Sequence, residues 1–355
     1  MKYSLRASCT CCSAPNLGRR QFLSGATAAA CSLALAGLTT PALAQAKPRI
    51  IDVHSHVVAP EWKVASKILN KDSPLLNNWT IQKTLDDMEK GGVETAITSS
   101  PAPQTFGLDQ AAAAKLAREC NDYAKRLESD YKGRFGTWAT LPFPYVDACL
   151  KEIEYAFDTL KVDGIGCLTS YGDKWLGDVA FEPIWQELNR RKATVNTHPT
   201  TPSCCTNPVP AIDDVYIEYG TDTARAIFTV IFSGFGAKFS DINWIWSHGG
   251  GVITSVYERF TVQVLQRPVY RDKFTRQQIE AQIRRFYYDT AAIPNDVTMS
   301  ALAKMVPASQ ILFGTDFPYR RADEYVKYLP TFFKDGDVAA IERDNALRLL
   351  PRLKA

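Results

Sequence analysis

Ile51-Asp52-Val53-His54-Ser55-His56 joins a short apolar run to two of the four histidines of the chain. Its apolar first half predicts a buried β-strand, and the two histidines stand at the carboxyl end of that strand. In a strand, residues i and i+2 point to the same face, so both imidazoles are expected to enter one cavity. Such a pair is suited to chelate a metal ion.

Seven more short apolar runs follow, bounded by Gly, Pro, Asp or Ser. The eight predicted strands are Ile50–Val53, Thr95–Ser99, Phe135–Leu141, Gly164–Leu168, Ala193–Thr197, Ile242–Trp246, Phe286–Asp289 and Ile311–Gly314. The helix-like segments between them include Thr80–Lys90, Ala111–Leu127, Tyr145–Leu160, Phe181–Arg190 and Pro294–Met305. Strands that alternate with helices indicate an α/β protein with a parallel sheet. At this length, a closed (β/α)8 barrel of the TIM type is the economical arrangement.

The first 44 residues resemble an export signal. Residues 18–24, Gly-Arg-Arg-Gln-Phe-Leu-Ser, have the twin-arginine pattern, and a modestly apolar stretch follows over residues 26–38. Ala42 and Ala44 suit the small positions before a signal-peptidase cut. The apolar stretch is too short and too rich in Ala, Gly and Ser to favour a membrane span, although a retained anchor is the alternative.

We therefore expect a twin-arginine signal peptide over residues 1–44 and a single barrel domain over residues 47–355. The protein is expected to be periplasmic or secreted, with no stable membrane span after cleavage. Residues 1–44 contain four basic residues and no acidic residue, so 41 basic residues become 37, against 38 acidic ones. This near-neutral body has no basic stripe for nucleic acid or an anionic membrane.

The cysteines do not form a disulfide framework. Four of the nine lie in the leader, and the remaining five have no CxxC spacing. The odd number predicts buried or free thiols. Cys204 and Cys205 are adjacent, so they are candidates for binding a soft metal or for oxidation, with an ordinary loop as the alternative.

The four histidines of the chain are its most informative residues. His54 and His56 end the first predicted strand, His198 ends the fifth, and His248 ends the sixth. Asp316 stands at the equivalent place after the eighth. A single histidine is usually structural, but this set indicates a metal site. Imidazole nitrogens with a carboxylate suit Zn²⁺, with Mn²⁺ or Fe²⁺ as alternatives, and three histidines with one aspartate leave a position open for catalysis.

These residues resemble the amidohydrolase superfamily, and within it the aminocarboxymuconate-semialdehyde decarboxylase-like branch. The matching segments are residues 53–56, 59–62, 134–136, 140–142, 176–178, 197–199, 247–251, 286–290 and 312–319. Tyr287-Tyr288-Asp289-Thr290-Ala291 and Asp316-Phe317-Pro318-Tyr319 look most similar to salicylate and 6-methylsalicylate decarboxylase-type members. The resemblance covers nearly the whole chain after residue 47.

The resemblance implies that His54, His56, His198 and Asp316 hold one divalent metal, Zn²⁺ by expectation and Mn²⁺ as the alternative. His248 would then be an unligated acid or base. Members with two metals bridge them through a carboxylated lysine on the fourth strand, and residues 164–168 contain no lysine. One metal and no organic cofactor are therefore expected.

The group that would hold the substrate carboxylate is left open. Some decarboxylases of this branch place an arginine after the first strand, but residues 57–80 contain none. The candidates to replace it are Lys63, Lys67, Lys71, Arg225 and Arg320. Trp175, Phe317 and Tyr319 are candidates to clamp a flat ring, with barrel and loop packing as the alternative role.

The expected function is metal-dependent, non-oxidative decarboxylation of a small aromatic, salicylate-like or unsaturated carboxylic acid, with release of CO2. Asp316 or His248 would deliver a proton to the carbon that bears the carboxylate. The alternative is a metal-dependent hydrolase of a small lactone or amide, with Asp316 as base. A third candidate is a catalytically silent periplasmic binding protein. The branch also makes a homodimer the expected assembly.

Overall fold

The computed structural model describes residues 50–354. The predicted signal peptide lies outside the described residues. Residues 50–354 all belong to one compact unit. Within this range, no helix combines the length and apolar character that a membrane crossing requires.

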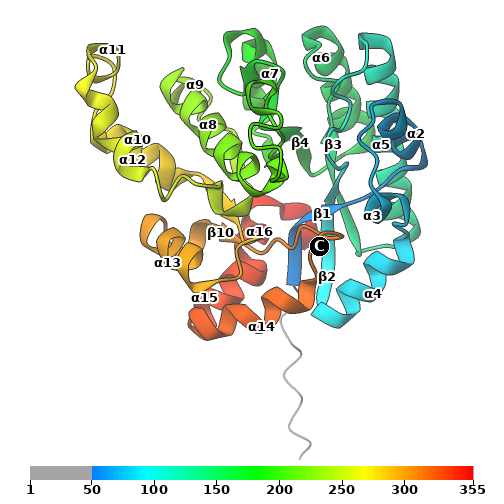
Figure 1. The fold of residues 1–355 in the computed structure, drawn as a ribbon. Coiled ribbons are helices and arrows are strands. Elements are labelled where there is room, and N and C mark those ends of the chain that lie inside the picture. Colours follow the sequence, from blue (N-terminus) through cyan, green and yellow to red (C-terminus); the bar gives the residue numbers. More distant parts are fainter. Residues whose placement is uncertain (1–49, 355) are drawn as a thin grey trace, which may run out of the picture. The chain divides into compact units, whose positions relative to one another are not determined.

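Eight parallel strands form the centre of the fold, in the order in which they occur along the chain (Figure 1). They are β1 (Ile50–His56), β2 (Val93–Ser99), β3 (Phe135–Thr140), β4 (Gly164–Leu168), β7 (Thr194–His198), β8 (Asn243–Trp246), β9 (Tyr287–Asp289) and β10 (Ile311–Leu312). Each of the eight predicted strands is confirmed within a few residues at its ends. The intervening β5 (Ser170–Tyr171) and β6 (Lys174–Trp175) form a small antiparallel hairpin that was not predicted.

The chain after β10 returns to β1 and nearly closes the barrel. The Val53 N–H donates to the Phe313 carbonyl at 2.9 Å, and the His56 N–H donates to the Phe317 carbonyl at 2.8 Å. Ser55 and Phe317 form a parallel bridge between these hydrogen bonds. The predicted (β/α)8 architecture is therefore confirmed.

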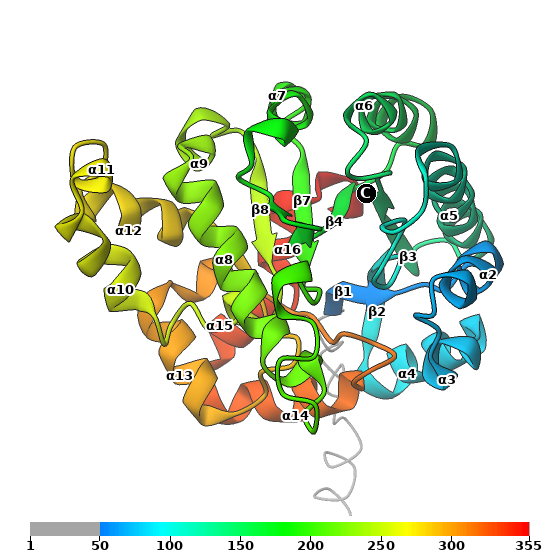
Figure 2. The same cartoon turned by 45° about the horizontal axis from the view of Figure 1, so that its top comes forward.

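Helices surround the strands (Figure 2). They are α2 (Pro60–Ile68), α3 (Pro74–Asn77), α4 (Ile81–Gly91), α5 (Gln110–Asp130), α6 (Val146–Glu154), α7 (Glu182–Arg190), α8 (Glu218–Phe232), α9 (Phe235–Lys238), α10 (Tyr257–Thr261), α11 (Pro268–Arg271), α12 (Arg276–Arg285), α13 (Asp296–Met305), α14 (Ala322–Phe332), α15 (Asp335–Ala339) and α16 (Asn345–Leu349). Side-chain caps begin several of them: Thr80 accepts from the Lys83 N–H at α4, and Asp109 accepts from the Ala112 N–H at α5. The predicted helix over Tyr145–Leu160 is α-helical only to Glu154 and then continues as a π-helix.

An apolar cluster fills the inside of the barrel. Its strand members are Ile51, Val53, Ile97, Trp138, Ile245 and Leu312, and α16 with the residue after it contributes Ala346 and Leu350. The Trp138 indole N–H donates to the Val53 carbonyl at 2.8 Å, so the one polar atom of this ring is satisfied. Each large apolar side chain buried there contributes roughly 1.5–3 kcal/mol. The polar residues that end the strands lie beyond this apolar cluster.

A bulge in β1 allows this strand to contribute side chains both to the apolar cluster inside the barrel and to the polar residues at its carboxyl end. Asp52 pairs with Ala96, but the next pairing on β1 is Ser55 with Thr98, so three steps on β1 match two on β2. The extra residue shifts the alternation of the side chains by one position, so two consecutive residues point into the barrel. Val53 packs in the apolar cluster, and His54, the next residue along the chain, faces the polar site.

Candidate metal centre

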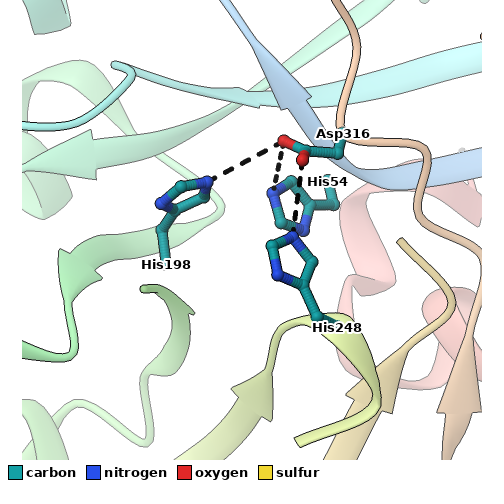
Figure 3. A group of neighbouring side chains, drawn as sticks. All are labelled: His54, His198, His248 and Asp316. Carbon is teal, nitrogen blue, oxygen red and sulfur yellow. Dashed lines mark ion pairs between the residues drawn. The ribbon is translucent and has the colours of Figure 1, made fainter. Parts of the chain in front are cut away.

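The five residues singled out from the sequence meet at the carboxyl end of the barrel (Figure 3 draws four of them). The Nε2 atoms of three histidines approach one oxygen of Asp316. The distances to this Oδ1 are 3.3 Å from His54, 2.9 Å from His56 and 3.8 Å from His198. The Nε2 atom of His248 faces the other oxygen, Oδ2, at 3.4 Å. The aspartate therefore divides the histidines into a group of three and a single one.

The compact set of potential ligand atoms differs in one member from the predicted ligands. His54, His198, His248 and Asp316 place their ligand atoms within 4.8 Å of one another, and His56 is not in that set. Within the described residues, the Nε2 atoms of His54, His198 and His248 are buried and form no hydrogen bond. Unpaired buried nitrogens around a carboxylate are a donor set that suits a divalent metal.

The other ring nitrogen of each predicted histidine ligand is fixed by a partner. Nδ1 of His54 lies 2.7 Å from Asp289, Nδ1 of His198 lies 2.8 Å from the Pro199 carbonyl, and Nδ1 of His56 lies 3.3 Å from the Ser99 hydroxyl. A carboxylate or a carbonyl can only accept, so Nδ1 carries the proton in His54 and His198. Their Nε2 atoms are then free to bind a metal.

Burial and charge set the protonation of the centre. Burial lowers the pKa of His56, and it lowers the pKa of His198 to about 4. Burial alone would raise the pKa of Asp316, but the charge on His54 and the nearby imidazoles of His198 and His248 hold that pKa well below its usual range. Burial opposes the change at His54, but the charges of Asp289 and Asp316 raise its pKa well above the usual value. Metal binding requires neutral imidazoles beside an ionised carboxylate, so a bound metal would displace one proton from His54.

Asp289 was not predicted as a site residue, but its carboxylate contacts two residues of the centre. Its Oδ2 accepts from His54 Nδ1 at 2.7 Å, and its Oδ1 accepts from the backbone N–H of His248 at 2.9 Å. One carboxylate therefore fixes a predicted metal ligand and the residue expected to move the proton. The sequence did contain a pattern that could have identified it: Asp289 ends its predicted strand in the way that His198 ends another.

The backbone at the centre takes conformations that most residues avoid. Asp316 has a φ of 68° and His248 a φ of 54°, and each such position costs on the order of 1–3 kcal/mol. A Cβ atom on Gly314 would lie 2.9 Å from the Cβ of His54 and 3.0 Å from that of Asp289. Only glycine allows these strands to approach so closely.

A cavity of about 380 Å³ lies next to the histidines. Tyr219 and Tyr319 line it, and their rings meet the rings of His198 and His56 edge-on, with centroids 6.1 Å and 5.7 Å apart. Lys71, one of the proposed carboxylate contacts, also lines this cavity. Its volume suits a small molecule.

Four of the substrate contacts predicted from the sequence lie outside the lining of this cavity. Trp175 and Arg225 line a second, mainly apolar cavity of about 290 Å³. There the Trp175 indole donates to Asp222 at 2.6 Å, and Arg225 pairs with Glu218. Phe317 lines a third cavity beside α4, and the Arg320 guanidinium pairs with Glu324 at 2.8 Å. These contacts stay predictions.

Comparison with known proteins agrees with this geometry. The sequence profile of the amidohydrolase family matches residues 51–352. The chain is 36% identical over 330 residues to the decarboxylase yanB of Aspergillus niger, covering 86% of this chain and 88% of that protein. It is 34% identical over 320 residues to the 6-methylsalicylic acid decarboxylase acuB of Aspergillus aculeatus, covering 86% and 96%.

A solved structure with the same fold contains a metal. It is a dihydroxybenzoic acid decarboxylase from a Polaromonas species with bound manganese and the inhibitor 2-nitroresorcinol. The TM-score is 0.74 at 21% sequence identity, with 86% of this chain and 98% of that chain covered. The resemblance seen in the motifs is confirmed, and the chain belongs to the amidohydrolase family, in the branch that contains these decarboxylases.

Proposed function

We propose that this protein is a metal-dependent carboxy-lyase that removes CO2 from a small aromatic acid of the salicylate type. The observation that carries the proposal is the way Asp316 divides the histidines: three face its Oδ1 and His248 faces its Oδ2. The first group suits a metal, and His248 is left beside it for proton transfer. The relatives yanB and acuB, each more than 30% identical to this chain, are named decarboxylases, which supports this reaction over hydrolysis.

We assign the metal to His54, His56, His198 and Asp316. His56 belongs in this set because its Nε2 comes nearest to Asp316 Oδ1, at 2.9 Å. A bound divalent cation would hold the substrate carboxylate and the adjacent phenol oxygen and would stabilise negative charge on that oxygen. Zn²⁺ is the proposed ion because three imidazoles and a carboxylate suit it, with Mn²⁺ as the alternative.

His248 is the proposed proton donor. Its Nε2 is buried but forms no hydrogen bond within residues 50–354, and its backbone is fixed by Asp289. Transfer of its proton to the ring carbon that bears the carboxylate makes that carbon tetrahedral. The bonding electrons of the carboxylate then return to the ring as CO2 leaves, so the phenol or carbonyl of the substrate is the electron sink and no organic cofactor is required.

The cavity beside the histidines is the proposed binding site for the ring. Tyr219 and Tyr319 stand on its histidine side, and Lys71 supplies a cation among its lining residues. Arg225, Arg320, Trp175 and Phe317 are the further proposed contacts. None of these four lines the cavity in this structure, so a role in catalysis requires that the segments that carry them move toward it.

The test is product analysis with the metal content measured on the same sample. Protein loaded with Zn²⁺ or Mn²⁺ is incubated with salicylate, 6-methylsalicylate, 2,6-dihydroxybenzoate and a set of lactones, and products are identified by mass. Loss of CO2 from a hydroxybenzoate is expected. Lactone or amide opening at unchanged carbon count would establish the hydrolase instead, and saturable binding without any product would favour a binding protein.

Two matched variants separate the metal ligands from the proton donor. His248→Asn is expected to retain the metal and lose turnover, whereas His56→Asn is expected to lose the metal. If His248→Asn loses the metal and His56→Asn retains it, the compact set of four ligand atoms describes the centre and our assignment is wrong.

We also propose that residues 1–44 direct twin-arginine export of a single domain, residues 47–355, to the periplasm or medium, where it forms a homodimer. The paired arginines and the Ala42 and Ala44 spacing support the route. Sequencing of the mature N-terminus, with an Arg19→Lys/Arg20→Lys variant as control, tests export. Light scattering tests the dimer.

A further inference from the structure

Two neighbouring cysteines lie at the rim of the histidine cavity, in the loop that leaves β7. Cys204 and Cys205 belong to one turn of 3-10 helix, and their sulfur atoms are 2.7 Å apart. Cys204 is exposed and Cys205 is half-buried. The residues on either side, Ser203 and Thr206, both line the cavity. Any bond between the two sulfurs therefore forms within the wall of the proposed binding site.

The other cysteines of the described chain have a different character. Cys120, Cys149 and Cys167 are buried in the core. Burial raises the pKa of each thiol, to about 12 for Cys120. Because the thiolate is the reactive form, these three are expected to be inert in the folded protein. Among residues 50–354, the rim pair alone combines access to solvent with a second thiol in contact.

A cation on α8 lies close to the pair. Burial by itself lowers the pKa of the Arg225 guanidinium. The negative charge of ionised Cys205 and Cys204, with that of Glu218, outweighs burial and raises this pKa, and Arg225 pairs with Glu218 at 3.3 Å. The same attraction favours a thiolate on the pair. A hydrogen bond to Cys204 raises the pKa of Cys205. Cys204 is the more exposed of the two sulfurs, so it is the one that an oxidant in solution reaches first.

We propose that Cys204 and Cys205 form a reversible vicinal disulfide at the rim of the cavity, by exchange with a small-molecule disulfide such as oxidised glutathione. The Cys204 thiolate attacks one sulfur of the oxidant, which forms a mixed disulfide and releases one glutathione thiolate. Cys205 then attacks Cys204, the mixed disulfide breaks and the second glutathione leaves. The cysteine pair loses two electrons and two protons, and the oxidant is reduced to two thiols.

The disulfide has a consequence for binding at the rim. A bond between adjacent residues closes a small ring that restricts the backbone on which Ser203 and Thr206 stand. Ordering or displacing such a wall changes ligand affinity, whereas the histidine centre is held by other contacts. The oxidised form is therefore expected to differ in KM and not in kcat. This consequence rests on the proposed function, but the formation of the bond does not.

The bond is tested on the full chain by peptide mass analysis. The native protein is incubated with oxidised glutathione, alkylated, and digested with trypsin, which releases residues 193–225 with Cys204 and Cys205 as the only cysteines. We expect this peptide to escape alkylation, to be two hydrogen atoms lighter, and to be restored by dithiothreitol. Cys204→Ser and Cys205→Ser are the matched controls. A doubly alkylated peptide, a persistent glutathione adduct or a covalent dimer would each overturn the proposal.

The consequence at the rim is tested by kinetics on the same samples. Oxidation is expected to shift KM by roughly two- to tenfold at constant kcat in the native chain, and to leave the Cys204→Ser/Cys205→Ser variant unaffected. An oxidised peptide with unchanged KM would refute the effect on binding and leave the disulfide intact. Absence of turnover in both redox forms would count against the proposed function alone, because the peptide mass is independent of activity.

Discussion

The metal centre and the cavity rim lie side by side but are built in opposite ways. The centre consists of buried side chains at strand ends, and each predicted histidine ligand has its second nitrogen fixed by a partner. The rim after β7 is a loop with exposed apolar residues, among them Tyr216, which is 81% exposed. On the proposed function, the buried strand ends would carry out the reaction, while the exposed loop at the cavity rim would set selectivity.

Removal of the charge at the centre should have the largest effect. In Asp316→Asn, the three imidazoles lose the anion on which they converge, so the metal is expected to leave and kcat/KM to fall on the order of 10³-fold. Metal content and turnover measured on one sample check this. Retained metal with near-normal turnover would show that the aspartate is not the anchor of the centre.

Low pH should reduce the free energy of unfolding of the metal-free protein through the histidines of the centre and not through the cavity rim. Burial lowers the folded-state pKa of His198 from 6.5 to about 4, so the unfolded chain binds more protons between these values. Stability that is complete above pH 6.5 is therefore lost as the pH falls toward 4, by about 3 kcal/mol from this residue. Lowered pKa values at His56 act in the same direction.

Urea unfolding of the metal-free protein across this pH range measures the effect. The raised pKa of His54 acts oppositely, because its contribution is complete below pH 6.5 and is lost only as the pH rises through the folded value. His198→Asn is the control and should flatten the slope. An unchanged slope in that variant would show that the slope comes from other groups.

The second carboxylate of the centre should have an intermediate effect. Asp289→Asn keeps the shape of the side chain but weakens its hold on His54 Nδ1 and on the His248 backbone. Metal affinity and kcat/KM are expected to fall roughly 10–100-fold, as for other partners of metal ligands. Chelator competition measures the affinity, and the exposed Asp335→Asn serves as control. Equal losses in both variants would refute the positioning role.

The centre was predictable from the sequence because its signals are local. Each histidine and Asp316 follows an apolar run, and parallel strands bring their carboxyl ends together whatever the loops do. The bulge at residues 52–55 was not predictable, because pairing with β2 creates it. Asp289 was passed over for a related reason: a lone aspartate at a strand end is ordinary until its distance to His54 is known.

The residues that line the cavity could not be predicted from the sequence, because the packing of the segments after the strands decides where their side chains lie. Trp175 and Arg225 were reasonable substrate contacts by chemistry, but the β5–β6 hairpin and α8 direct them into a separate cavity. Tyr219 lies on α8, whose sequence carries no sign that it faces His198. Long-range placement of this kind depends on how the loops pack, and one sequence does not encode it in a readable pattern.

The smallest predicted effect concerns the tyrosine that joins the two regions. Tyr319 lines the cavity, and its ring meets the His56 ring edge-on at 5.7 Å. In Tyr319→Ala the substrate ring loses one aromatic contact of about 1 kcal/mol, so KM should rise roughly fivefold with kcat and metal content unchanged. The highly exposed Tyr216→Ala is the matched control and should leave both constants as they are. A fall in kcat or loss of metal in Tyr319→Ala would contradict this prediction. It would mean that Tyr319 belongs to the metal centre, and that only residues farther out on the loops affect substrate binding alone.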